Sequence, residues 1–358
     1  MRSDLGWSYT LAGAMNTVNA LGYLLGALIT PHLLQRWGAA RVLVSGAVMA
    51  SVFMALSGFF TDTAPLLAQR LLAGIASALV FIAGGLMAAR LGALQPTRGG
   101  LLIGLYYGGT GFGIVLSALL VPAVLEASKN MPHGWVWAWW ALALACVVVT
   151  VILGLPARVL MNLTPATPAV DTRTVHFTWR PFAFALSGYA MFGVGYIGYM
   201  TFVIALLREQ GVSPSAVTVF YALLGVAVLV SPRIWASLLD RYRGGQVLAL
   251  FCALLGLATI LPAVTTSWPV ILISGVLFGA VFLSLVASTT ALVRHNLPQA
   301  AWAKGISAFT IVFAAGQIIG PTIVGWIADG PGGLARGLVF SALALWVGAV
   351  LAWQQRAL

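Results

Sequence analysis

The chain has 358 residues, of which 61% are hydrophobic and only 7% are charged. A soluble domain carries about 25% charged residues, so this composition excludes a soluble protein and indicates an integral membrane protein. The net charge of +11 does not indicate nucleic-acid binding, because the basic residues stand singly between apolar runs. We therefore expect a lipid bilayer around the protein and no nucleic-acid partner.

Eleven apolar runs, each long enough to cross a bilayer as a helix, follow one another along the chain. They are continuous over about 20 residues and lack the alternation of barrel strands, so an all-α polytopic membrane protein is expected. The predicted spans are 9–34, 42–60, 66–89, 101–125, 135–155, 182–207, 214–239, 247–264, 268–293, 306–328 and 338–353.

The longest polar connection, residues 156–180, contains Asp171, Arg173 and His176. It divides the chain into an N-terminal half, 1–155, with five spans and a C-terminal half, 181–358, with six. Lys and Arg residues are concentrated in alternate connections, twelve on one side against four on the other. The positive-inside rule then places the connection 156–180 and the C-terminus in the cytoplasm.

The C-terminal half repeats the N-terminal half in the same helix order. At an offset of 205 residues, 4–43 aligns with 209–248 without a gap, and Gly6 and Ser8 fall on Gly211 and Ser213. Such a parallel repeat is typical of certain secondary transporters. The span 182–207 has no partner in this alignment, because its counterpart would precede Met1, so we expect that this reading frame lacks the first helix of the usual twelve.

Several motifs of this sequence resemble those of the major facilitator superfamily. Its basic loop pattern appears around Arg36, Gly38 and Arg41, and a second copy around Asp240 and Arg241. The glycine-proline pattern of the superfamily is matched by Gly316, Gly320 and Pro321. The segments 19–28, 195–202 and 316–321 are similar to the uncharacterised YbfB/YjiJ branch of bacterial transporters. The resemblance implies two helical halves around a central cavity, acting as a monomer in the bacterial cytoplasmic (inner) membrane.

Polar side chains inside the spans are the candidate substrate-binding residues. Arg70 and Arg233 are the two intramembrane cations, and such charges usually mark a pathway. Amide and phenol side chains within the spans are further candidates, because residues three or four positions apart lie on the same face of a helix. The alternative roles are snorkelling for the arginines and hydrogen bonding between helices for the others. The full set is Asn16, Asn19, Tyr23, Arg70, Tyr196, Tyr199, Arg233 and Gln317.

Neither enzyme chemistry nor a cofactor is expected. Cys146 and Cys252 have no second Cys or His at ligand spacing, so no metal site is predicted. No P-loop is present, which excludes an ATP motor of that kind. The spans hold arginines, amides, hydroxyls and phenols but no Asp or Glu, a set that suits binding better than bond cleavage.

The predicted function is therefore secondary active transport of a small solute by alternating access. Two intramembrane guanidinium groups without a carboxylate favour an anionic solute, for example a carboxylate. A neutral-solute or drug exporter is the alternative, and so is a non-transporting or truncated membrane protein on a transporter scaffold. The solute, the direction of transport and the coupling ion are not assigned by the sequence.

The orientation is testable with single cysteines in a background that lacks Cys146 and Cys252. We expect an impermeant thiol reagent added from outside to label Cys at Gly332 but not at Gly244, because the basic connections face the cytoplasm. Labelling at Gly244 together with protection at Gly332 would contradict the orientation.

Overall fold

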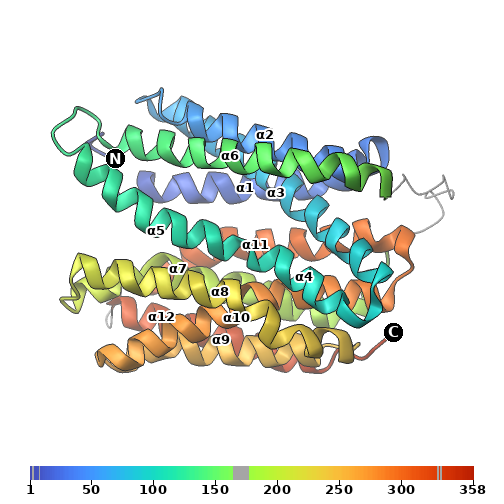
Figure 1. Cartoon of the computed structure of the whole chain (residues 1–358). Helices are drawn as coiled ribbons and strands as arrows, with labels where there is room; N and C mark the ends of the chain where they lie inside the picture. Colours follow the sequence, from blue (N-terminus) through green and yellow to red (C-terminus); the bar gives the residue numbers. More distant parts are fainter. Residues whose placement is uncertain (2–3, 8, 164–176, 329, 331–332) are drawn as a thin grey trace. The chain divides into compact units, whose positions relative to one another are not determined.

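The computed structural model describes the chain except for residues 2–3, 8, 164–176, 329 and 331–332. The described residues form helices, turns and connections and no strand (Figure 1). The predicted cytoplasmic residues Asp171 and Arg173 lie outside the described part. So do Ser8 of the predicted repeat and Gly332 of the labelling experiment.

Within the described residues, eleven helical segments are long and apolar enough to cross a membrane, which confirms the predicted number of spans. Their ends differ from the predicted ones by a few residues, because several helices continue past the apolar run. The long helices are α1 (Tyr9–Trp37), α2 (Ala39–Leu56), α3 (Thr63–Leu94), α4 (Gly99–Gly108), α5 (Thr110–Ala127), α6 (Trp135–Leu163), α7 (Ala183–Glu209), α8 (Pro214–Arg241), α9 (Gln246–Val264), α10 (Trp268–Asn296), α11 (Trp302–Ala328) and α12 (Gly333–Trp353). Short 3₁₀ turns precede α4 (Pro96–Arg98), α7 (Arg180–Phe182) and α11 (Gln299–Ala301).

The predicted span 101–125 consists of two helices, α4 and α5, that together make one crossing, Gly99–Ala127. The interruption is a single residue, Gly109. Its N–H still donates to the Leu105 carbonyl at 3.0 Å, whereas the N–H of Phe112 reaches only three residues back, to Gly109 itself. The break is therefore a local tightening of the helix, which apolar periodicity does not signal.

Two compact units account for the contacts of the chain. The first comprises Met1–Met87 and Ser117–Thr174, and in it α2 packs against α6. The second comprises Ala88–Leu116 and Val175–Leu358. In this second unit α7 packs against α11 and α12, and α8 packs against α4 and α10. The segment Ala88–Leu116 thus packs with residues of the C-terminal half. The predicted boundary at 156–180 was defined by the sequence repeat and not by contacts between helices.

The same backbone geometry recurs in both halves at the predicted offset of 205 residues. Gly6 and Gly211 both have positive φ angles, 65° and 81°. Ser213 then caps α8, its Oγ accepting a hydrogen bond from the Ala216 N–H at 3.3 Å, with Pro214 as the first helical residue. Because a positive φ angle favours glycine, the shared turn geometry explains why a glycine stands at both Gly6 and Gly211.

Close helix contacts recur as well. A Cβ atom at Gly74 on α3 would overlap the Asn19 carbonyl oxygen of α1, and one at Gly279 on α10 would overlap the Leu224 carbonyl oxygen of α8. Both pairs are related by the offset of 205. In lipid, helices associate through packing rather than through the hydrophobic effect, so small residues that let backbones touch carry much of the association.

The first unit also has a polar contact outside the spans. The Asp4 carboxylate accepts a hydrogen bond from Trp135 Nε1 at 2.6 Å and pairs with His133 Nδ1 at 2.6 Å. These hydrogen bonds, that of His133 first, favour the charged carboxylate and lower the pKa of Asp4. The contact therefore stabilises the fold above the ordinary pKa of an aspartate and is lost as the pH falls through the lowered value.

Replacement of Gly74 or Gly279 by Ala is expected to destabilise the protein by roughly 1–3 kcal/mol, because each added methyl forces two helix backbones apart. Thermal unfolding of the purified protein in detergent measures the effect. Gly154→Ala is the matched control, since a Cβ there meets open space, and a helical Gly→Ala change is neutral or stabilising by about 0.5–1 kcal/mol. Equal melting temperatures for all three variants would show that the close contacts do not hold the helices together.

Candidate functional site

A column of aromatic rings joins α7, α10 and α11 in the second unit. Tyr196 lies at its centre, with ring centroids 4.8 Å from Phe192 and 5.2 Å from Phe282. Phe313 stacks on Tyr196 at 5.2 Å and on Tyr189 at 5.4 Å. The interplanar angles within these pairs are 20–26°. Phe282 and Phe313 were not among the predicted site residues, because a phenylalanine in an apolar helix gives no signal of its own.

Tyr196 and Gln317, two predicted site residues from different helices, are brought together by the fold. Gln317 Nε2 donates a hydrogen bond to the Tyr196 hydroxyl, linking α11 to α7. Gln317 follows Phe313 by one helical turn, so the amide and the ring lie on the same side of α11. The arrangement places an uncharged polar pair beside the stacked rings.

Tyr199, the third predicted residue of α7 and α11, packs between helices. Its ring is fully buried and stacks on Phe278 with centroids 4.1 Å apart. Its hydroxyl pairs with Ser274 Oγ at 2.7 Å, and that Oγ in turn donates to the Ala258 carbonyl. In this structure the hydroxyl of Tyr199 is thus used to hold α7, α9 and α10 together.

Two of the predicted residues of the first unit, Asn19 and Arg70, contact each other. Asn19 Nδ2 donates to the backbone carbonyl of Arg70 at 2.9 Å, which connects α1 to α3. The Arg70 guanidinium lies 5.5 Å from the centre of the Trp139 ring, a cation–π contact. Tyr23 meets Phe81 edge to face, and Asn16 is exposed. Asn19 therefore makes a hydrogen bond between helices, and Trp139 is the partner that the sequence did not reveal for Arg70.

Arg233 lies on the exposed side of α8. It shares this side with Val226, Val230 and Ile234, whose side chains are all exposed. The buried side of α8 carries Leu224, Val228 and Ser231 instead. No hydrogen bond or ion pair joins Arg233 to another residue of the described part of the chain.

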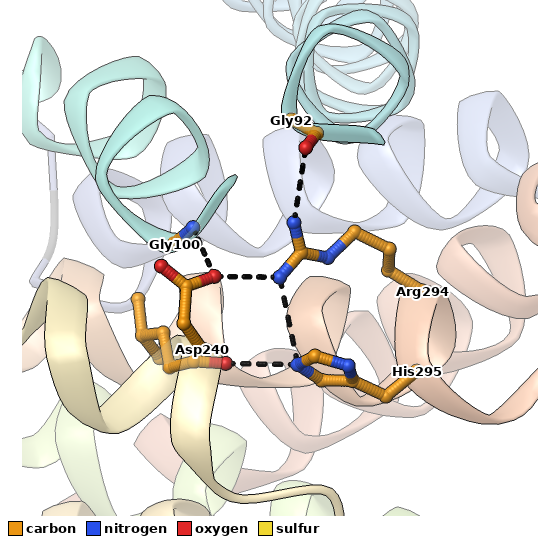
Figure 2. A network of polar contacts seen from close by, with 6 residues as sticks. Gly92, Gly100, Asp240, Arg294 and His295 are labelled. Carbon is orange, nitrogen blue, oxygen red and sulfur yellow. Dashed lines mark hydrogen bonds and ion pairs between the residues drawn. The ribbon is translucent and has the colours of Figure 1, made fainter. Parts of the chain in front are cut away.

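A polar network, shown in Figure 2, connects the ends of α8 and α10 with the start of α4. Arg294 Nη2 donates to Asp240 Oδ1 at 2.7 Å, and the Gly100 N–H donates to the same oxygen at 2.6 Å. Arg294 Nη1 reaches the Gly92 carbonyl at 3.5 Å. His295 Nε2 donates to the Leu239 carbonyl at 3.0 Å. The Asp240 carboxylate thus meets both a guanidinium and the N-terminus of a helix, two groups that stabilise negative charge.

Glycines make room for this network. A Cβ at Gly99 would overlap the Arg294 guanidinium, and one at Gly100 would lie 2.5 Å from the Ala236 carbonyl oxygen. The sequence singled out Asp240 as a motif residue, whereas Arg294 was not among the predicted site or motif residues. Their pairing across 54 residues depends on the fold and has no local signal.

The remaining motif residues have structural roles or are exposed. Gly38 has a φ angle of 78° between α1 and α2, and Arg36 and Arg41 beside it are exposed. Arg241 lies over the Tyr242 ring at 5.8 Å. On α11, Gly316 faces Gly193 of α7, and Gly320, which precedes Pro321, faces the Val194 backbone. These two α11 glycines allow α7 and α11 to approach closely at the level of the Tyr196–Gln317 pair.

The fold is that of the major facilitator transporters. The fucose:proton symporter FucP of E. coli superposes with a TM-score of 0.69 at 16% sequence identity, over 98% of this chain and 92% of that one. The proton:xylose symporter XylE superposes with a TM-score of 0.75 at 14% identity, over 98% of this chain and 88% of that one. At these identities the likeness concerns the fold alone.

The chain belongs to the family described as "Uncharacterised MFS-type transporter YbfB", whose model matches residues 1–353. This confirms the predicted resemblance. The family comprises membrane transporters for small-molecule solutes, not enzymes. A relative from Mycobacterium tuberculosis, "Chloramphenicol efflux pump Rv0191", is 28% identical in an alignment of 316 residues that covers 83% of this chain and 74% of the relative.

Replacement of Asp240 by Asn is expected to destabilise the protein by roughly 3 kcal/mol, because it leaves the Arg294 guanidinium, 9% exposed, without its counter-charge. The double variant with Arg294→Gln should be more stable than the sum of the two single changes predicts. Thermal unfolding of the four proteins measures this coupling. Glu126→Gln is the control, because the Glu126–Lys129 pair is mostly exposed and such pairs contribute about 0–1 kcal/mol. Strictly additive effects would show that the ion pair carries no stability.

Proposed function

We propose that this chain is a secondary transporter that exports a small uncharged organic solute by alternating access between its two halves. We place it in the bacterial cytoplasmic membrane, with its C-terminus in the cytoplasm, on the basis of the loop charges. The observation that carries the choice of solute is the hydrogen bond between Tyr196 and Gln317, flanked by stacked rings. Ligand sites are mostly apolar with a few placed polar groups, and this set has that character.

The positions of the intramembrane charges support an uncharged solute. Arg70 already has the Trp139 ring as a neighbour, and Arg233 lies among exposed aliphatic side chains. Neither arginine lies on α7, α10 or α11, the helices that hold the aromatic column. A charge in the middle of a membrane costs roughly 2.5 kcal/mol or more, so a transporter for uncharged solutes gains nothing from one beside its solute.

Export is proposed because of the relative from Mycobacterium tuberculosis, which is named as a chloramphenicol efflux pump. That likeness covers most of both chains. It supports the direction of transport and provides a first solute for testing.

An anionic solute, such as a carboxylate, is the second candidate. The observation that favours it is that Arg233 has no ion-pair or hydrogen-bond partner among the described residues. A guanidinium offers two parallel donors that match a carboxylate. In this case the Arg233 guanidinium would bind the solute.

The experiment is flux into proteoliposomes, with and without a proton gradient, of radiolabelled chloramphenicol and radiolabelled benzoate. We expect chloramphenicol to be transported. Gln317→Leu should lower the initial rate of transport roughly fivefold or more, because the loss of one hydrogen bond costs about 1 kcal/mol. Gln354→Leu, in an exposed glutamine at the end of the chain, is the matched control.

The outcomes separate the candidates. Movement of benzoate alone, abolished by Arg233→Gln but kept by Gln317→Leu, would replace the proposal by the anionic one. No flux of either compound, from protein that melts cooperatively, would favour the non-transporting scaffold.

A further inference from the structure

Two side chains beside Tyr196 are partly exposed on the inward sides of their helices. Phe282 of α10 lies nine residues after Ile273, which is 59% exposed, and Gln317 of α11 lies nine residues before Trp326, which is 78% exposed. Nine residues of an α-helix correspond to a rotation of about 180° relative to the starting side chain. Phe282 and Gln317 therefore point away from the exposed apolar sides, and their partial exposure is on the side that faces neighbouring helices.

The rings at this position stack in nearly parallel planes. The Tyr196 and Phe282 planes differ by 21°, and those of Tyr196 and Phe313 by 20°. Phe282 stacks in turn on Phe278, with centroids 5.5 Å apart. Of these rings Phe282 is the one that is not buried. Packing of a further ring against such a series is favourable, and Phe282 is the member of the series that is partly exposed.

The polar pair beside these rings has unused hydrogen-bonding capacity. The Tyr196 hydroxyl accepts from Gln317 and still has its own proton to donate. Gln317 has a second N–H and its Oε1, for which no partner exists among the described residues. Two donors and one acceptor are thus available next to the partly exposed ring.

No charged group lies near this position on the three helices that form it. The nearest ionisable charged residues on α7, α10 and α11 are Arg208, Arg294 and Lys304. Each is at least twelve residues from Tyr196, Phe282 or Gln317 respectively, about 18 Å along the helix. These three helices therefore offer no counter-charge at this position to a carboxylate or an ammonium group of a solute.

We infer that Tyr196, Phe282 and Gln317 form a slot that binds an uncharged, planar aromatic ring carrying a polar substituent. The ring stacks on Phe282, and the substituent hydrogen-bonds to the Gln317 amide and the Tyr196 hydroxyl. This inference rests on the proposed function, because it specifies that the uncharged solute of the transporter carries an aromatic ring. It also assigns Phe282 a role in specificity.

The test is equilibrium binding to the purified full chain in detergent, measured by saturation-transfer NMR. The probes are 4-nitrobenzyl alcohol, the charged analogues 4-nitrobenzoate and 4-nitrobenzylamine, and the non-aromatic cyclohexylmethanol. Phe282→Leu removes the ring, Phe282→Tyr keeps it, and Phe112→Leu, in an exposed phenylalanine of α5, is the matched control. Thermal unfolding confirms that each variant is folded.

We expect 4-nitrobenzyl alcohol to bind more tightly than the other three probes. Phe282→Leu should raise its Kd roughly three- to tenfold, the range for loss of one aromatic stack, while Phe282→Tyr and Phe112→Leu leave it unchanged. Gln317→Leu should raise the Kd of 4-nitrobenzyl alcohol, because its polar substituent loses a hydrogen-bond partner.

Two results would overturn the slot. The first is equal binding of the aromatic and the cyclohexyl alcohol, and the second is aromatic binding that Phe282→Leu does not change in a folded variant. Either result leaves the proposed function intact if chloramphenicol flux is observed. Absence of flux together with Phe282-dependent binding would instead refute the transport proposal and keep the slot.

Discussion

The close approach of helix backbones at glycines is the constraint on which the rest of this structure depends. Lipid tails are as apolar as the side chains that face them, so burial of apolar surface adds little to helix association in a membrane. Direct backbone packing, at the contacts of Gly74 with Asn19 and of Gly279 with Leu224, holds these helices together instead. Gly316 and Gly320 do the same between α7 and α11, and thereby bring Gln317 within hydrogen-bonding distance of Tyr196.

The sequence could predict the features that depend on local composition. Runs of about 20 apolar residues determine the eleven spans, since a lipid-embedded backbone has to satisfy its own hydrogen bonds. The repeat was visible in polar residues at helix ends and recurs as the positive φ of Gly6 and Gly211. The interruption at Gly109 was not predictable, because a glycine in an apolar run fits a regular helix equally well.

The candidate site was predictable only in part. Tyr196 and Gln317 stood out as polar residues in spans, but their contact joins residues 121 positions apart and has no local signal. Phe282 could not be singled out in a chain that is 61% hydrophobic. Likewise, Asp240 was visible as a motif residue, whereas its partner Arg294 and the Gly100 N–H follow from the packing of α4 and α10 against α8.

The two halves share backbone contacts but not polar chemistry. Asn19 and Leu224 occupy equivalent positions and accept the same glycine contact, yet only Asn19 can hydrogen-bond through its side chain, and it does so to Arg70. Gln35 stands where the second half has Asp240, so the ion pair with Arg294 has no charged counterpart at the equivalent position of the first half. Repetition therefore maintains the positions at which helices touch, while side chains at those positions diverge.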